Sequence, residues 1–440
     1  MTKDILKKYK FKLFIKKNSK YLISILLILV GGLVGFYFSY SKYSTKQETE
    51  VVRTTVGDFI SGDVVLAYSI DGVKGSDAFP KQNTGYEGVS VTCDNEATAT
   101  WDNTIWSIKM TNSGNGKRVK CNVEFKSQET KTISGITFKL NTFSPDFSKS
   151  ACSTCESTEA GVFAAEDDYG TSYYYRGSVE NNYVDFADKT WRIIRINGDG
   201  TVRLIYYDQN LSGTLSVGGL ESDNAYLGYM YGTPGSSTYE DTHKNINDSN
   251  IKEILDSWYE DNLKSLYSNY LADAGFCNDR HLLFTSTQTG FGSGISYYDG
   301  YGRIAASLPS LKCIQSNDLF TTTSASMGNK ALKYSIATIT ADEAMLAGYS
   351  GGSFDGGWNY TKSSNNYLEI NVSYYTMTPA GFYIPYGNNQ GKLRANYITV
   401  GGYLDDHWVG GTYTIRPVIN LKSDAIKSGN GEVNTPYKVA

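Results

Sequence analysis

The first forty residues show a basic stretch followed by an apolar one. Residues 1–20 contain eight lysines and one aspartate, and residues 21–40 contain no charged side chain. At about 1.5 Å of rise per residue, a helix of that length covers the roughly 30 Å hydrocarbon core of a bilayer. The pattern predicts a basic cytoplasmic arm over 1–20 and a single transmembrane helix over 21–40. It places the rest of the chain outside the cell membrane, as in a type II single-pass protein.

Two other interpretations of this segment stay open. A cleaved signal peptide would have a shorter apolar region and a small-residue cleavage site, for which Ser39-Tyr40-Ser41 is a weak candidate. A prepilin would have a Gly-Phe junction with a glutamate five residues on, which this segment lacks. The length of the apolar run favours the retained anchor.

Short alternating segments follow a polar stalk over 41–55. Apolar and polar positions alternate, between Gly, Asn and Asp residues, over 63–70, 88–93, 97–101, 106–111 and 117–125. Several such strands at this spacing predict a small β-sandwich-like spacer over 56–130. Residues 131–165 begin like a strand and then become a linker that contains Cys152-Ser-Thr-Cys155.

The remainder, 166–440, has mixed periodicity. Apolar segments on both sides of Asn197-Gly-Asp-Gly200 predict a β-hairpin over 190–207. Apolar side chains recur at helical spacing from Ile251 to Tyr259, after a Ser249-Asn250 cap, so a helix is expected there with Trp258 in the core. A second, short helix is expected after Ile339, with Thr340 as its cap.

Composition narrows the class of partner. The net charge is −4, and without the basic arm the chain is more acidic, which argues against nucleic acid. The 36 tyrosines and 44 glycines resemble the mixture that antibody paratopes use for contact and adaptable hydrogen bonding. The same excess is also typical of a β-rich secreted protein.

Six cysteines fall into three local groups. An even number outside the cytoplasm favours disulfides, and the grouping predicts Cys93–Cys121 and Cys277–Cys313. Cys152 and Cys155 lie in a connector flanked by Ser, Thr and Pro, without the strand-to-helix context of a redox pair or a second pair for zinc. A local bridge between them is therefore expected.

Three segments together resemble a known family. Trp191-Arg-Ile-Ile-Arg, the helix from Asn250, and the closing Tyr374-Tyr375-Thr-Met-Thr-Pro379 with Ile415-Arg-Pro-Val-Ile-Asn-Leu421 resemble a bacterial extracellular family of unknown function with "WxxRSP" and "GVRPALNL" segments. The resemblance covers residues 173–440. It implies a C-type-lectin-like fold, akin to the formylglycine-generating-enzyme-like proteins, and supplies no activity.

The expected fold class is therefore a single N-terminal transmembrane helix, a small all-β sandwich-like domain and an α+β C-type-lectin-like domain. This chain lacks the family's usual arginine before Pro379. It also lacks the Glu-Pro-Asn and Trp-Asn-Asp motifs of calcium-dependent lectins and the redox cysteine pair of the oxidase branch. No metal or cofactor is expected.

No complete catalytic motif is present. The three histidines form no HExxH, and there is no GxSxG elbow or P-loop. Cys277-Asn-Asp-Arg-His281 is the most catalytic-looking cluster, because a free Cys277 thiolate beside His281 and Arg280 could act as a nucleophile. The alternative is a disulfide-bonded, inert Cys277 with Asp279 and Arg280 as a local ion pair.

Aromatic and acidic residues in Gly-rich loops over 349–411 are the candidate ligand contacts. Aromatic rings can stack on a sugar while carboxylates accept its hydroxyls. The candidates are Trp358, Tyr360, Tyr374, Tyr375, Asp405, Asp406, His407 and Trp408. Inward folding of the loop tryptophans is the competing interpretation. Arg416 is expected to close a buried ion pair with Asp342 or Glu343.

These observations predict a membrane-anchored bacterial cell-surface binding or adhesion protein whose C-terminal head recognises a glycan or a surface protein. Two alternatives stay open. One is a surface hydrolase or thiol transferase that uses Cys277 and His281. The other is a structural envelope protein whose head packs against its own copies.

Overall fold

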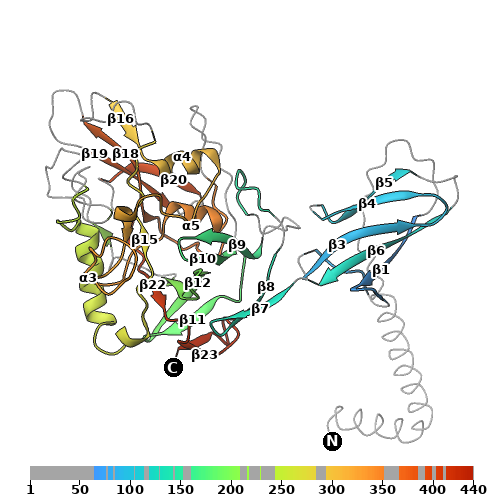
Figure 1. The fold of residues 1–440 in the computed structure, drawn as a ribbon, viewed down its shortest axis with the longest axis horizontal. Helices are drawn as coiled ribbons and strands as arrows, with labels where there is room; N and C mark the ends of the chain where they lie inside the picture. Colours follow the sequence, from blue (N-terminus) through green and yellow to red (C-terminus); the bar gives the residue numbers. More distant parts are fainter. Residues whose placement is uncertain are drawn as a thin grey trace, which may run out of the picture. The chain divides into compact units, whose positions relative to one another are not determined.

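The structure is a computed structural model of the 440-residue chain. It describes residues 64–439 except 76–77, 83–84, 104, 113–117, 128, 142–143, 152–159, 209–215, 218–227, 229–242, 284–293, 351–365, 385–391, 399–402 and 410–412. Figure 1 labels the helices and strands of these residues.

The N-terminal part of the described chain is a small all-β module. A four-stranded sheet has the order β2-β1-β6-β3, and β4 pairs with β5 in a separate hairpin. The strands are β1 (Val64–Ile70), β2 (Val73–Lys74), β3 (Tyr86–Cys93), β4 (Thr98–Asp102), β5 (Ser107–Asn112) and β6 (Val119–Ser127). The segments that alternation predicted as strands are therefore confirmed.

The alternation in β6 also builds the core of this module. Val119, Cys121, Val123 and Phe125 are all buried, while the residues between them are more exposed. The ring of Phe125 stacks on Trp106 with centroids 5.4 Å apart. Cys121 lies opposite Cys93 on β3 and forms the predicted disulfide with it.

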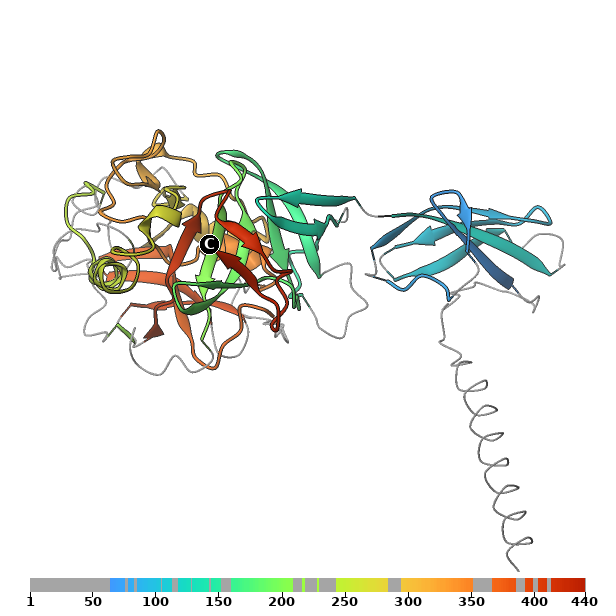
Figure 2. The ribbon, with the colours of Figure 1, turned by 90° about the horizontal axis from the view of Figure 1, so that it is seen from below.

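The larger domain is built on two sheets. An eight-stranded sheet follows the order β22-β13-β12-β11-β24-β23, with β10 pairing with β12 and β9. Its strands are β9 (Gly161–Asp167), β10 (Gly170–Arg176), β11 (Tyr183–Phe186), β12 (Lys189–Ile196), β13 (Val202–Tyr206), β22 (Val418–Leu421), β23 (Ile426–Ser428) and β24 (Tyr437–Val439). In Figure 2 the C-terminal strands, in red, lie beside these green strands. β12 and β13 confirm the predicted hairpin.

The second sheet has six strands. Its order is β14-β21-β18-β19-β20, and β16 pairs with β18. The strands are β14 (Ser216–Val217), β16 (Gly294–Tyr297), β18 (Tyr374–Ile384), β19 (Lys392–Ile398), β20 (Leu404–Trp408) and β21 (Tyr413–Thr414). Two further two-stranded sheets occur among the described residues: the hairpin of β7 (Thr130–Ile133) with β8 (Ile136–Lys139), and the pairing of β15 (Phe276–Cys277) with the more distant β17 (Leu319–Phe320).

Within the part of the chain that the structure describes, helices are few and short. They are α3 (Asn250–Asn262), α4 (Asp299–Ala306) and α5 (Ala341–Leu346), with 3-10 turns η2 (Ser268–Tyr270) and η3 (Ser316–Asp318). Ser249 caps α3 by accepting from the Lys252 amide, and Thr340 caps α5 in a capping box with Glu343. Both predicted helix starts are confirmed. The helical pattern continues past Leu263, but α3 ends there in a turn.

The core of the larger domain surrounds Trp191 of β12. Trp191 is fully buried, its indole N–H donates to the Phe186 carbonyl at 3.0 Å, and its ring lies 5.6 Å from that of Tyr206. Trp258 of α3 packs beside it with centroids 6.1 Å apart. Ile136 and Phe138 of β8 belong to the same core, within the segment expected to be a linker.

The predicted fold class was wrong. The described chain is mostly β-strand with few helices, where an α+β head was expected. Sheet pairings such as β13 with β22 join segments far apart in the sequence, and local periodicity does not reveal them. No helix among the described residues is long and apolar enough to cross a membrane. The predicted helix over 21–40 lies outside the described residues.

Replacing Trp191 by alanine should lower the free energy of unfolding by about 3–5 kcal/mol, because the change removes a fully buried indole and leaves a cavity. Leu266→Ala is the control, since Leu266 is 72% exposed and should change stability by about 0.5 kcal/mol or less. Denaturant unfolding measures both. Equal, small effects would show that Trp191 does not organise this core.

Candidate functional site

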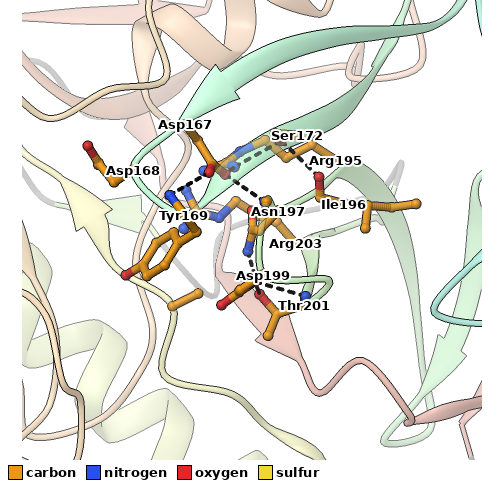
Figure 3. Close-up of polar contacts among 12 residues, drawn as sticks. Asp167, Asp168, Tyr169, Ser172, Arg195, Ile196, Asn197, Asp199, Thr201 and Arg203 are labelled. Atoms are coloured by element: carbon orange, nitrogen blue, oxygen red, sulfur yellow. Dashed lines mark hydrogen bonds and ion pairs between the residues drawn. The ribbon is translucent and has the colours of Figure 1, made fainter.

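A network of buried charges joins three elements of the larger domain. The carboxylate of Glu343 on α5 accepts from Arg195 Nε on β12 at 3.0 Å and from Arg203 Nη1 on β13 at 2.7 Å. Arg195 also donates to Asp167 at the end of β9, with Nη1 to Oδ2 at 2.6 Å (Figure 3). All four side chains are almost completely buried, so the network is internal.

The register of the β12–β13 hairpin places two buried arginines together, and their charges require a buried carboxylate partner. Arg195 and Arg203 lie opposite each other on β12 and β13, so two guanidinium groups are buried side by side. Burial by itself would raise the pKa of Glu343, but Arg203 and Arg195 outweigh it and lower that pKa to about 2. Glu343 is therefore a carboxylate that neutralises the pair.

A second ion-pair group adjoins the first. Arg303 of α4 holds Asp342 through Nε and Nη2, both at 2.8 Å, and its Nη2 also donates to Asp279. Burial raises the pKa of Asp279 to about 6, helped by the nearby Asp342 and opposed by Arg303. One guanidinium thus serves two buried carboxylates.

The cavity between these groups is very small. It measures about 20 Å³ and is lined by charged residues that include Asp167, Arg195, Asp279, Arg303 and Glu343. A space of that size holds about one water molecule. The network therefore joins β9, β12, β13 and α5 with little space between their charged side chains.

Two predicted ion pairs are wrong. Asp279 pairs with Arg303, while its neighbour Arg280 pairs with Asp318 at 2.7 Å. Arg416 is fully buried as expected, but it donates to the carbonyls of Tyr206 and Leu368 rather than to Asp342 or Glu343. Sequence proximity misled the first prediction. In the second, arginines from β12, β13 and α4 already hold the acids.

The predicted disulfide Cys277–Cys313 is confirmed. Its sulfur atoms are not thiols, and His281 instead contacts Asp299 through Nδ1. The hydrolase or thiol-transferase alternative would require a reduced form of the protein. Cys152 and Cys155 lie outside the described residues. Within the described ranges, no cluster of three or more His, Cys, Asp or Glu side chains could hold a metal ion.

The structure separates the predicted ligand contacts. Tyr374 and Tyr375 are each 1% exposed, in the core rather than at the surface. On β20, Asp405 is half-buried and Asp406 is buried. The backbone of His407 and Trp408 belongs to the same strand. Trp358 and Tyr360 lie outside the described residues. The ligand roles of all eight candidate residues stay predictions.

A groove of about 380 Å³ lies at another place on the larger domain. Its lining includes the loop between β10 and β11, the side chain of Arg192 and the segment 366–371. Three tyrosines surround the Arg192 guanidinium, whose Cζ lies 3.8 Å from the Tyr183 ring centroid, 5.3 Å from that of Tyr207 and 5.5 Å from that of Tyr367. Such contacts are favourable cation–π geometry.

Backbone and amide hydrogen bonds fix the walls of this groove. Arg192 donates from Nε to Asn182 Oδ1 and from Nη2 to the Val179 carbonyl, both at 2.6 Å. Asn182 in turn donates to the Ile193 carbonyl at 2.9 Å. Val179 and Asn182, in the loop between β10 and β11, are therefore tied to β12.

A second concavity of about 480 Å³ adjoins the first and shares Glu180 and Tyr183 with it. Its other wall is the turn at 432–434, placed there because the Tyr183 amide donates to the Gly431 carbonyl at 2.8 Å. Gly431 has φ +81°, and a Cβ at this position would lie 2.2 Å from the Asn181 carbonyl oxygen. Only glycine permits this close approach. We call the two concavities together the Tyr183 groove.

Sequence reasoning missed the Tyr183 groove. Tyr183 begins β11, Arg192 lies in β12 and Tyr207 follows β13. No sequence motif links these three residues. One signal was available, since the arginines of Trp191-Arg-Ile-Ile-Arg interrupt an otherwise apolar strand. A buried cation needs partners, and for Arg192 those partners are amides, carbonyls and aromatic rings.

Comparisons with known proteins give no match, whether with protein-family models, curated proteins or solved structures.

Asp279→Asn should change the pH dependence of stability. The pKa of Asp279 rises from 3.8 to about 6 on folding, so this group stabilises the fold at low pH and loses that contribution as pH rises through this window. The variant's stability relative to the parent should therefore increase between about pH 4 and pH 7, by on the order of 3 kcal/mol.

Asn is suitable at position 279 because the residue has φ +50°, which Asn tolerates as well as Asp. Chemical unfolding across this pH range measures the difference, and Asp261→Asn on the exposed face of α3 is the control. A difference between variant and parent that does not change with pH would contradict the assignment.

Thiol labelling tests the disulfide assignment. Cys277 and Cys313 should resist alkylation in the unfolded, unreduced protein and should both react after reduction. Peptide mass spectrometry reads the result. Labelling of Cys277 without reductant would restore the thiol-dependent alternative.

Proposed function

We propose that the protein is a cell-surface binding protein whose larger domain recognises a glycan through the Tyr183 groove. The observation that carries the proposal is the groove itself, an open concavity lined by tyrosine rings beside amide and carboxylate groups. Glycan sites combine these features, because a ring face packs on a sugar while polar groups accept and donate to its hydroxyls.

The individual side chains support this use. Tyr183 and Tyr207 are partly exposed and line the groove, and their rings lie 5.8 Å apart in an edge-to-face arrangement. Asn371 and Glu369 on the opposite wall offer an amide and a carboxylate. Because Arg192 is held by Asn182 and Val179, the rings above it are fixed before a ligand arrives.

The disulfides support an extracytoplasmic location. Cys93–Cys121 closes the small module and Cys277–Cys313 closes a loop of the larger domain. Such bridges persist in oxidising compartments and are rare in the cytosol. A thiol-dependent reaction receives no support, because the Cys277 sulfur is bonded to Cys313.

A glycan array with the purified full chain tests the proposal. At least one glycan should bind reproducibly, and Tyr183→Ala should weaken its binding by roughly tenfold through loss of ring contact. Tyr183→Phe is the matched control, since it keeps the ring and should retain most of the affinity.

Absence of any reproducible glycan signal would sink the proposal. So would equal binding by Tyr183→Ala, provided that its unfolding midpoint stays close to that of the parent.

A further inference from the structure

Lys252 on α3 is the only lysine among the described residues that is buried. Its Nζ contacts Asp256 Oδ2 and lies 4.0 Å from Asp248 Oδ2. Lys252 and Asp256 are four positions apart on one face of the helix, and Asp248 lies just before the Ser249 cap. Within the described part of the chain, the ion-pair partners of this buried ammonium group are thus two nearby carboxylates.

The hydrogen bonding of this ion pair is incomplete. The second oxygen of each carboxylate, Asp248 Oδ1 and Asp256 Oδ1, is buried and has no hydrogen-bond partner among the described residues. By contrast, Glu343 is shared by two arginines and also accepts from the Thr340 amide. Taking two charges out of water is unfavourable unless hydrogen bonds satisfy their remaining lone pairs. An uncharged group in the place of the Lys252–Asp256 pair would avoid this penalty.

Burial favours the uncharged form of both groups. Lys252 is 0% exposed and Asp256 is 6% exposed. Burial raises the pKa of Asp256, and the contact with Lys252 opposes this rise. Transfer of one proton from the ammonium group to the carboxylate converts the pair into an amine and a carboxylic acid in contact. An amide is made from these two groups.

We infer that Lys252 and Asp256 are joined by an amide bond between their side chains. Nζ of Lys252 attacks Cγ of Asp256, so that an Nζ–Cγ bond forms and one C–O bond of the carboxyl group breaks. The hydroxyl leaves as water with a proton from Nζ. Nothing is oxidised or reduced, and the step needs no other reactant. The inference does not depend on the Tyr183 groove.

Asp248 is placed to carry the proton. Its Oδ2 lies 4.0 Å from Lys252 Nζ, and its side chain is 29% exposed, where that of Lys252 is 0% exposed. The Asp248 carboxylate accepts a proton from Nζ as the amide forms and returns it to the departing hydroxyl, which is general base and then general acid catalysis. It is unchanged at the end of the reaction.

The bond fastens one turn of α3 covalently. Ile251 and Leu255, which neighbour the linked residues in the sequence, belong to the core of the larger domain. Trp258 on the next turn packs beside Trp191. The amide therefore holds the helix that covers Trp191, and a reducing agent, which opens disulfides, leaves it intact.

Peptide mass spectrometry of the purified, reduced full chain tests the bond. Trypsin should fail to cleave after Lys252, and one peptide from Asn245 to Lys264 should be recovered, lighter than its sequence by one water molecule. Its fragment spectrum should contain no break between positions 252 and 256. Glu260 and Lys264 are the internal control, because this exposed pair has the same spacing on the same helix and should stay unlinked.

Two variants assign the roles. Lys252→Met removes the amine and keeps an unbranched side chain, so its peptide should have the full sequence mass. Asp248→Asn should slow bond formation by about a hundredfold or more, so unlinked peptide should accumulate. Complete linkage in Asp248→Asn would contradict the role of Asp248 as proton carrier.

Normal cleavage of the parent after Lys252, with full peptide masses, would overturn the inference, and this measurement does not depend on whether a variant folds. A loss of water that persists in Lys252→Met would also overturn it, because the loss would then come from ring closure at an aspartate. Neither result bears on glycan binding, so the proposed function is tested separately.

Discussion

The carboxylate of Glu343, shared by Arg195 and Arg203, holds the larger domain together at its centre. It links α5 to the β12–β13 hairpin, and the capping box of Thr340 fixes the helix that presents it. Removing one member of a buried ion pair typically costs about 3–5 kcal/mol, because the remaining charge is left without a partner. Loss of the Glu343 carboxylate would leave Arg195 and Arg203, which lie opposite each other on β12 and β13, without this shared partner.

The same short helix positions the groove. At the C-terminal end of α5, the carbonyls of Met345 and Leu346 accept from Arg176 Nη1 at 2.9 and 3.1 Å. The Ala347 carbonyl accepts from the Gly177 amide at 2.9 Å and from Asn366 Nδ2 at 2.6 Å. Gly177 begins the loop between β10 and β11, and Asn366 begins the opposite wall. The helix that carries Glu343 therefore also positions both walls of the Tyr183 groove.

Arginine has two different roles in this domain. Arg195, Arg203 and Arg303 neutralise buried acids and allow the elements to meet in one arrangement. Arg192 has no carboxylate partner among the described residues and is stabilised by carbonyl, amide and aromatic contacts. A planar guanidinium can stack on a ring and donate hydrogen bonds at the same time, so Arg192 contacts the Tyr183 ring while it bonds to Asn182 and Val179.

The local structure follows from short-range patterns in the sequence. Alternation predicted β1 and β3 to β6, turn residues predicted the β12–β13 hairpin, and capping residues predicted the starts of α3 and α5. Cysteine grouping predicted two disulfides. Each depends on residues whose preferences act over a few positions or close a short loop.

The sheet order, the ion-pair partners and the groove depend on contacts between distant segments of the chain. β22 pairs with β13 from more than two hundred residues away, and Arg416 lies beside Leu368 rather than Glu343. Tyr183, Tyr207 and Tyr367 meet around Arg192 because three separate chain segments pack there. Such contacts depend on which surfaces exclude water together, and periodicity along one segment contains no information about the surface that will cover it.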